Sequence, residues 1–448
     1  MSLVFPPTPV SRDMQEQCEG RQSAQPWTLW LLLAPFALAP HALAADANSP
    51  CSSSVALEYR TSVGKIQTNR VKNLVANGEP SSFEFPDFLH HFRVRLKVTE
   101  PMPSDWRLSI YGEKEAAWQA LQIFGPKNFE QSKTVWSKRF DGKKIKTILY
   151  TSLPHDAGSF LKIDAAISVP RESNVAHYSV ENTADLKWQC LGCPLRQEHL
   201  QLCQKDKIDC KEVSPKTVRL GEGVGMVMVF GSTAAWTCSG FMISPELFLT
   251  NWHCGGTKAD EANYWDADIL RTALIDFSWD GDDLSSEYGW SGKPAFEGKN
   301  VVMDRDLDYA IFRVKPWLQS IGPPPIMPIK AGAVLKDEET RLQIIHHPLS
   351  RVKTLTQKNC KVEKSSYHSW MTKVDDVDFL HKCDTEGGSS GAPVFDEAGF
   401  VIGIHHSGHS QTENGICDQN NKAVKIDRVL DNLPSALKDE IMRWQTTF

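Results

Sequence analysis

Three residues whose side chains can together perform nucleophilic catalysis follow one another in the second half of the chain, namely His253, Asp308 and Ser390. His253 ends an apolar segment beside Cys254, and a disulfide from Cys254 back to Cys238 would fix its loop. Asp308 begins an apolar stretch, where a carboxylate is costly unless it is paired, and an imidazole N–H is a suitable partner. The order predicts that Ser390 attacks a carbonyl carbon, His253 accepts its proton and Asp308 orients the imidazole.

Ser390 lies in the glycine-rich segment EGGSSGAP. A nucleophilic serine needs a tight turn that presents its Oγ, and glycine permits such turns because it lacks a Cβ. The backbone N–H groups of Gly388 and Ser390 are predicted to form an oxyanion hole. Taken singly, a histidine, an aspartate or a serine in these places is more often structural, and only their combination favours catalysis.

The segments TCSGFMIS to LTNWHC, DYAI and GGSSGAP resemble, in the same order, the three motifs of the chymotrypsin-like serine protease superfamily. The resemblance covers about 210–435 and is greatest to bacterial glutamyl-endopeptidase-like and lysyl-endopeptidase-like enzymes. It implies a two-barrel fold and hydrolysis of peptide bonds through an acyl-enzyme, with no cofactor. Ser389 stands where the digestive enzymes carry aspartate, so activation by a new N-terminus paired to that aspartate is not expected.

The resemblance leaves two alternatives for the substrate side chain. Asp384 falls where trypsin-like enzymes bind Lys or Arg, whereas Thr385 and His405 fall where glutamyl endopeptidases receive Glu. An aspartate attracts a cation, while threonine and histidine donate hydrogen bonds to a carboxylate. We favour a preference for Glu or Asp. Cys210 and Cys417 resemble the bond by which lysyl-endopeptidase-like enzymes tie the start of the catalytic domain to a loop after the serine.

The N-terminus has the order of a secretory signal, with Arg12 and Arg21 before an apolar run at 27–39 and small residues after it. The apolar run is short for a membrane span, and a retained anchor is the alternative. We predict a signal peptide at 1–44, no membrane span after its removal, and a secreted or periplasmic protein.

Of the 11 cysteines only Cys18 lies in this leader, so an even set remains, as disulfides in an oxidising compartment require. Cys360 and Cys383 bracket a hairpin-like stretch and are predicted to pair. The spacing in 189–215 loosely resembles a zinc site, but the exported context favours a cysteine-rich linker stapled by disulfides. Four cysteines have no assigned partner: Cys51, Cys190, Cys193 and Cys203.

Residues 45–188 are predicted to form a β-sandwich-like accessory domain, because short alternating strands are separated by turn signals. The clearest strands lie at 92–98, 106–111, 144–150 and 161–169. A removable propeptide is the alternative for this region. Residues 216–448 are predicted to form an all-β protease domain that ends in a helix, since apolar residues recur at helical spacing from Val424 to Trp444.

The net charge of -6 and the absence of a basic block argue against nucleic-acid binding. No metal is predicted, because the spacing of four loop histidines does not fit that of zinc ligands. These histidines are His346, His347, His406 and His409. We expect a monomer that acts on proteins or peptides. The competing hypothesis is an inactive homologue that keeps the fold and binds or adheres to a surface partner, and the intact triad argues against it.

Overall fold

The computed structural model describes most of the chain between residues 61 and 445. The described residues are 61–68, 71–75, 78–85, 91–99, 101–114, 117–130, 133–137, 140–141, 144–152, 160–169, 200–201, 213–231, 234–256, 265–277, 287–315, 324–350, 353–357, 360–369, 374–408, 410–411, 417–418 and 420–445. No helix among them is long and apolar enough to cross a membrane. The predicted signal peptide and most of the cysteine-rich linker lie outside these ranges.

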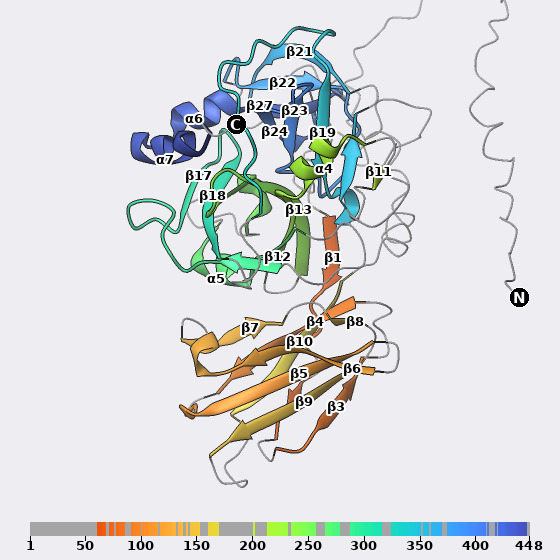
Figure 1. The fold of residues 1–448 in the computed structure, drawn as a ribbon, viewed down its shortest axis with the longest axis vertical. Helices are drawn as coiled ribbons and strands as arrows, with labels where there is room; N and C mark the ends of the chain where they lie inside the picture. The colour runs from red at the N-terminus through yellow and green to blue at the C-terminus, as the bar shows by residue number, and fades with distance from the viewer. Residues whose placement is uncertain are drawn as a thin grey trace, which may run out of the picture.

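The N-terminal unit consists of two antiparallel sheets that enclose one apolar core, at the foot of Figure 1. One sheet runs β2 (Lys72–Asn73), β10 (Leu161–Val169), β4 (His91–Val98) and β7 (Thr134–Trp136), with β8 (Phe140–Asp141) also paired to β4. The other runs β3 (Ser81–Glu84), β9 (Lys144–Thr151), β5 (Trp106–Lys114) and β6 (Ala117–Phe124). Phe92, Val94 and Leu96 alternate into the core, as the period-two pattern of β4 predicts.

Six strands of the C-terminal half close into a barrel, because β13 pairs with both β12 and β14 while the remaining strands complete the circle. These strands are β12 (Val224–Phe230), β13 (Ala234–Met242), β14 (Leu247–Thr250), β15 (Leu274–Asp276), β16 (Glu287–Trp290) and β18 (Tyr309–Lys315). β17 (Val301–Asp304) pairs with β18 beside the circle. The barrel confirms the all-β prediction for this half.

The second sheet of this half is a half-barrel, and its last strand approaches the third strand of the order where Arg341 forms a bridge with Lys361. Its order is β11 (Leu200–Gln201), β20 (Thr354–Thr356), β19 (Leu342–His346), β23 (Pro393–Asp396), β24 (Val401–Ser407), β27 (Asn421–Lys425), β22 (Asp378–His381) and β21 (Val362–Tyr367). A separate short pair is formed by β25 (Ser410–Gln411) and β26 (Cys417–Asp418).

The described helices are few and short: α4 (Pro215–Gly221), α5 (Ala267–Thr272), α6 (Ile426–Asn432) and α7 (Ser435–Gln445). α6 and α7 are the predicted C-terminal helix, divided at Pro434 because proline cannot continue a helix interior. The helical region begins at Ile426 rather than Val424, since Val424 pairs with both β22 and β24.

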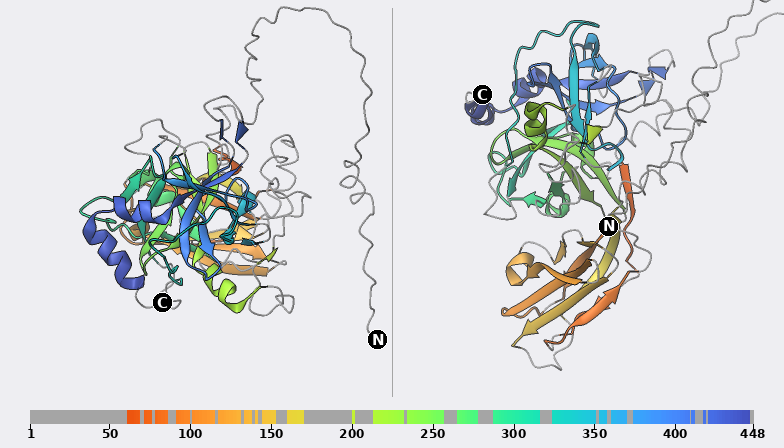
Figure 2. Two further views of the ribbon diagram at one scale, coloured as in Figure 1. Left: turned by 90° about the horizontal axis from the view of Figure 1, so that it is seen from above. Right: turned by 45° about the vertical axis from the view of Figure 1, so that its right-hand side comes forward.

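The two halves of the chain meet through a strand and an apolar cluster. β1 (Thr61–Lys65) precedes the sandwich in sequence but pairs antiparallel with β13 of the barrel, as the right-hand view of Figure 2 shows. Trp136 and Ile167 of the sandwich pack with Met226, Met228 and Phe230 of the barrel, among others. The sandwich is therefore attached to the barrel by a shared sheet as well as by buried side chains.

Candidate functional site

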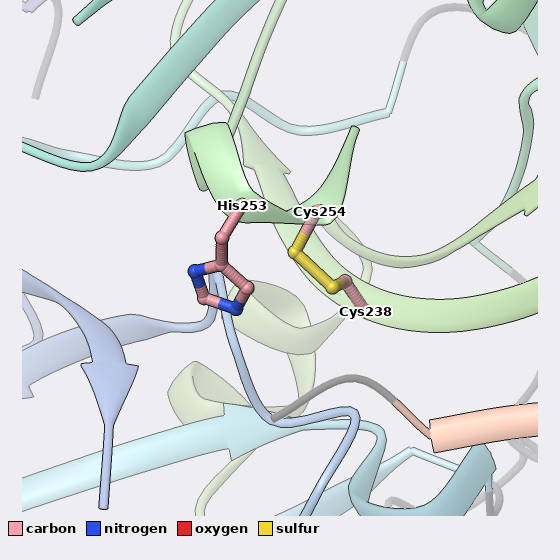
Figure 3. A group of neighbouring side chains, drawn as sticks. All are labelled: Cys238, His253 and Cys254. Atoms are coloured by element: carbon pink, nitrogen blue, oxygen red, sulfur yellow. A yellow bond between two sulfur atoms is a disulfide. The ribbon is translucent and has the colours of Figure 1, made fainter. Parts of the chain in front are cut away.

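His253 lies on a one-turn 3-10 helix, Trp252–Cys254, directly after β14. The disulfide between Cys254 and Cys238, sixteen residues apart, ties this turn to β13, and Figure 3 shows both cysteines beside the imidazole. Trp265 adds a second support by donating from Nε1 to the Trp252 carbonyl at 2.9 Å. The turn therefore holds the His253 backbone from two sides.

The ligand atoms of Cys238, His253 and Cys254 lie within 4.8 Å of one another, a spacing that a metal site would also show. Here the two sulfur atoms are bonded to each other, so neither offers the thiolate that a metal requires. His253 Nδ1 lies 2.7 Å from Asp308 Oδ2, so this nitrogen already has a partner. These three residues form a structural clamp on the histidine rather than a metal centre.

Asp308 is fully buried in the turn between β17 and β18, and both of its carboxylate oxygens face His253. Oδ1 accepts from the His253 backbone N–H at 2.9 Å, and Oδ2 lies 2.7 Å from the ring Nδ1. The Asp308 backbone has φ +47°, a left-handed conformation that costs on the order of 1–3 kcal/mol. Asn251 holds this strained turn by donating from Nδ2 to the Asp308 carbonyl at 2.7 Å.

The charge on Asp308 is set by competition between burial and its partners. Burial acts to raise the pKa of the carboxyl, but the charges and hydrogen bonds of His253 and His406 outweigh it, so the pKa lies below the ordinary value. Asp308 is therefore ionised at neutral pH and can hold the His253 proton on Nδ1. His253 Nε2 is then the nitrogen that can accept a proton from a nucleophile.

The turn that carries Ser390 is anchored on β13. Gly388 has φ +93° and Gly391 has φ +85°, conformations that residues with a Cβ rarely adopt. A Cβ on Gly391 would also lie only 2.1 Å from the Ser239 carbonyl oxygen, so the glycine permits a close approach of two backbones. Ser239 in turn donates from its amide to the Ser390 carbonyl at 2.7 Å and from its hydroxyl to the Gly388 carbonyl at 2.9 Å. The predicted nucleophile and the predicted oxyanion-hole residue are thus tied to the strand that holds Cys238.

Ser389 is fixed by a histidine that the sequence analysis assigned only to structure or metal. His346 Nδ1 lies 2.8 Å from the Ser389 hydroxyl, which also accepts from the Glu386 amide at 3.1 Å. His346 Nε2 is 3.1 Å from the Thr356 hydroxyl, which donates to the Asp384 carbonyl. The Ser389 hydroxyl and His346 therefore brace the turn at the position where the resemblance places an aspartate in digestive enzymes.

Of the predicted specificity residues, His405 lies against a further buried histidine, His381. Thr385 and His405 are buried and Asp384 is half-buried. The Cys383 amide donates to His381 Nδ1 at 3.3 Å, and His381 Nε2 lies 3.2 Å from His405 Nδ1. The second disulfide, Cys360–Cys383, fixes the residue directly before Asp384.

Burial keeps His381 and His405 neutral. Burial, followed by the charges of His406 and Lys422, lowers the pKa of His381 to about 3, and burial also lowers the pKa of His405 well below its ordinary value. His381 Nδ1 accepts from an amide, so the single ring proton of His381 belongs on Nε2, from which it donates to His405. His405 then carries its own proton on Nε2.

His406 is the site residue whose role the sequence analysis missed. Its ring lies between two fully buried carboxylates, with Nδ1 3.3 Å from Asp308 Oδ2 and Nε2 3.2 Å from Asp378 Oδ2. The dipeptide His405-His406 on an apolar strand was the available signal, because neighbours in a strand point to opposite faces.

Several predictions concern residues outside the described ranges and stay predictions. These residues are His409, Cys210, Cys51, Cys190, Cys193, Cys203 and the side chain of Cys417.

The part of the chain that holds the candidate site is similar to a known family of domains. Residues 238–404 match the family described as a trypsin-like peptidase domain, and this range contains His253, Asp308 and Ser390. No curated protein gives a significant match to the chain.

Solved structures also match, at low similarity. The active form of the Rv3671c protease from M. tuberculosis is 19% identical, with a TM-score of 0.33, over 49% of this chain and 82% of that one. The HtrA-type protease AlgW with a decapeptide is 13% identical, with a TM-score of 0.34, over 51% and 67% of the two chains. Deg5 is 18% identical, with a TM-score of 0.31, over 48% and 91%.

Proposed function

We propose that the trypsin-like peptidase domain of this protein is an active serine endopeptidase with His253, Asp308 and Ser390 as its catalytic triad. The observation that carries the proposal is the pair of contacts from Asp308 to His253. One carboxylate oxygen accepts a hydrogen bond from the His253 backbone amide, and the other lies beside the ring Nδ1. Two such contacts fix both the tautomer and the orientation of a general base.

The reaction follows from these roles. Ser390 Oγ attacks the peptide carbonyl carbon while its proton passes to His253 Nε2, and the amides of Gly388 and Ser390 stabilise the resulting oxyanion. The imidazolium returns the proton to the leaving amine, which breaks the C–N bond and leaves an acyl-enzyme. Water then attacks the ester by the same route, with His253 again as the base, and releases the acid.

Labelling with a fluorophosphonate probe tests the activity. The wild-type protein is expected to be labelled, because the probe reacts only with an activated serine, and Ser390→Ala is expected to lose all labelling and all peptide hydrolysis. Ser435→Ala is the matched control, since Ser435 is exposed at the start of α7. A wild-type protein that resists the probe after any maturation step is instead an inactive homologue that binds a partner.

We propose further that the domain cleaves after Glu or Asp. The support is a chain of hydrogen bonds: the Cys383 amide donates to His381, and His381 donates to His405 Nδ1. The proton of neutral His405 then lies on Nε2, where it can be donated to a substrate carboxylate. The buried Lys422 adds positive charge to this region, since its ammonium acts on His381. Thr385 would donate a second hydrogen bond to the carboxylate.

Peptide substrates that differ only in the residue before the cleaved bond test this preference. Glu is expected to exceed Gln and Lys, and His405→Leu is expected to lower kcat/KM for the Glu substrate roughly 10- to 100-fold, the value of a hydrogen bond to a charged group. The Gln substrate should lose much less, which serves as the control. A preference for Lys that disappears in Asp384→Asn would assign the pocket to Asp384 instead.

We also propose that the protein is exported to the periplasm or the medium after removal of 1–44. The two disulfides at the site support this location, because thiols remain reduced in most cytosols.

A further inference from the structure

His406 joins the two sheets of the peptidase domain at the candidate catalytic site. It lies on β24 of the half-barrel, and its ring contacts Asp308 from the closed barrel and Asp378 at the start of β22. Its side chain is about 1% exposed, and both carboxylates are fully buried. The His406 ring therefore lies between two carboxylates, and all three groups are closed to solvent.

The geometry favours a positive charge on the ring, since Nε2 hydrogen-bonds to Asp378 Oδ2 and Nδ1 makes an ionic contact with Asp308 Oδ2. Both ring nitrogens face carboxylate oxygens, and an ionised carboxylate can only accept hydrogen bonds. A neutral imidazole has a single N–H, so only the imidazolium presents a donor to each side. The contact with Asp308, at 3.3 Å, is an ionic contact longer than the 2.7 Å between His253 Nδ1 and the same oxygen.

The protonation behaviour agrees with this assignment. Burial acts to lower the pKa of His406, but attraction to Asp378 and contacts with Asp308 outweigh it and raise the pKa to about 9. Because the folded pKa exceeds the ordinary value of 6.5, the stability that this proton contributes is complete below about pH 6.5 and is lost as the pH rises through about 9.

We propose that His406 is a positioning residue of the peptidase, an imidazolium held by Asp378 that fixes the Asp308 carboxylate and offsets part of the negative charge facing His253. The proposal rests on the endopeptidase activity proposed above. Its consequence is that the carboxylate that orients His253 is itself held in place by a second, positively charged partner.

The other groups that face this cluster do not supply the same charge. On β22 and β24, His381 and His405 are held neutral by burial. The ammonium of Lys422 on β27 donates to the carbonyls of Gly408 and Asn420, and its charge acts on His381. The charges of His346 and His253 act on His405. Among the described residues, His406 is thus the cation in contact with Asp308.

His406→Gln in the full-length protein tests the role through the pH dependence of kcat/KM. The acid limb of the profile is expected to move to higher pH, since the variant removes the positive charge that contacts Asp308. At pH 7, kcat is expected to fall roughly tenfold with little change in KM, which is the behaviour of a lost transition-state interaction. His368→Gln is the control, because it removes a half-buried imidazole that stacks on Tyr367 and has no part in the proposed site, so the acid limb should stay in place.

A folded His406→Gln variant whose acid limb and kcat match those of the wild type would overturn the proposal. A measurement on the wild-type protein keeps it testable if the variant does not fold. NMR of isotope-labelled histidine side chains is expected to show one ring with both nitrogens protonated at pH 8, titrating near pH 9. Neutral rings throughout at pH 8 would refute it. The NMR readout does not depend on activity, so failure of this inference and failure of the peptidase proposal remain distinguishable.

Discussion

Replacing Asp308 by asparagine is expected to lower kcat/KM by a factor on the order of 10⁴, the size typical for the buried aspartate of a Ser-His-Asp triad. The His253 backbone amide is a fixed donor, so the single amide oxygen of asparagine should turn toward it. The NH₂ group then faces His253 Nδ1, which must become an acceptor, and the ring proton moves to Nε2. A ring protonated at Nε2 cannot accept the proton of Ser390.

The same substitution should leave the protein folded. Asparagine tolerates the left-handed backbone that Asp308 adopts, and it removes a buried charge rather than adding one. Asp304→Asn is the matched control, because Asp304 lies in the same turn and caps the Leu307 amide at 2.9 Å without touching His253. Steady-state hydrolysis by both variants, with unfolding followed by circular dichroism, makes the comparison. Retention of more than a tenth of the activity by folded Asp308→Asn would contradict the proposed triad.

Loss of the sandwich is expected to unfold the peptidase domain, which argues against the removable propeptide. A chain beginning near residue 211 would lack β1 and would expose Met226, Met228, Phe230 and Leu274 of the shared cluster. At about 1.5–3 kcal/mol for each buried side chain, their exposure costs an amount comparable to the whole stability of a typical domain. The mature protein recovered from cells is therefore expected, by mass, to retain residues 61–169.

Trp136→Ala tests the interface without deleting a domain. Trp136 stacks on Phe230 with ring centroids 4.6 Å apart, so its truncation is expected to destabilise the protein by about 3 kcal/mol and to speed thermal inactivation of the peptidase. Trp118→Ala on β6 is the control, since Trp118 is exposed and its ring contacts the Lys146 ammonium, an interaction of about 1 kcal/mol or less. Equal inactivation rates for the two variants, or an active protein that starts near residue 211, would show that the sandwich is dispensable.

Much of the architecture could be predicted because it depends on local pattern. The strand β10 has the predicted bounds, and β4, β5 and β9 begin within one residue of the predicted positions, since alternating apolar runs bounded by turn residues specify them. The strand β27 was missed because its sequence NKAVK carries two lysines, and Lys422 is buried by bonds to carbonyls that no local pattern reveals. The Asn251 support of Asp308 was missed for the same reason.

By itself the sequence was enough to propose a catalytic triad of His253, Asp308 and Ser390, because each lies in a short segment whose residue types suit one role. The segments hold a histidine fixed by a disulfide, an acid at the start of a strand and a serine between glycines. Tertiary structure alone decided what surrounds Asp308. His406 on β24 contacts Asp308 with one ring nitrogen. Asp378 lies at the other ring nitrogen because β24 and β22 both pair with β27. Side chains from three distant segments meet there, and strand register, which no single segment encodes, fixes that meeting.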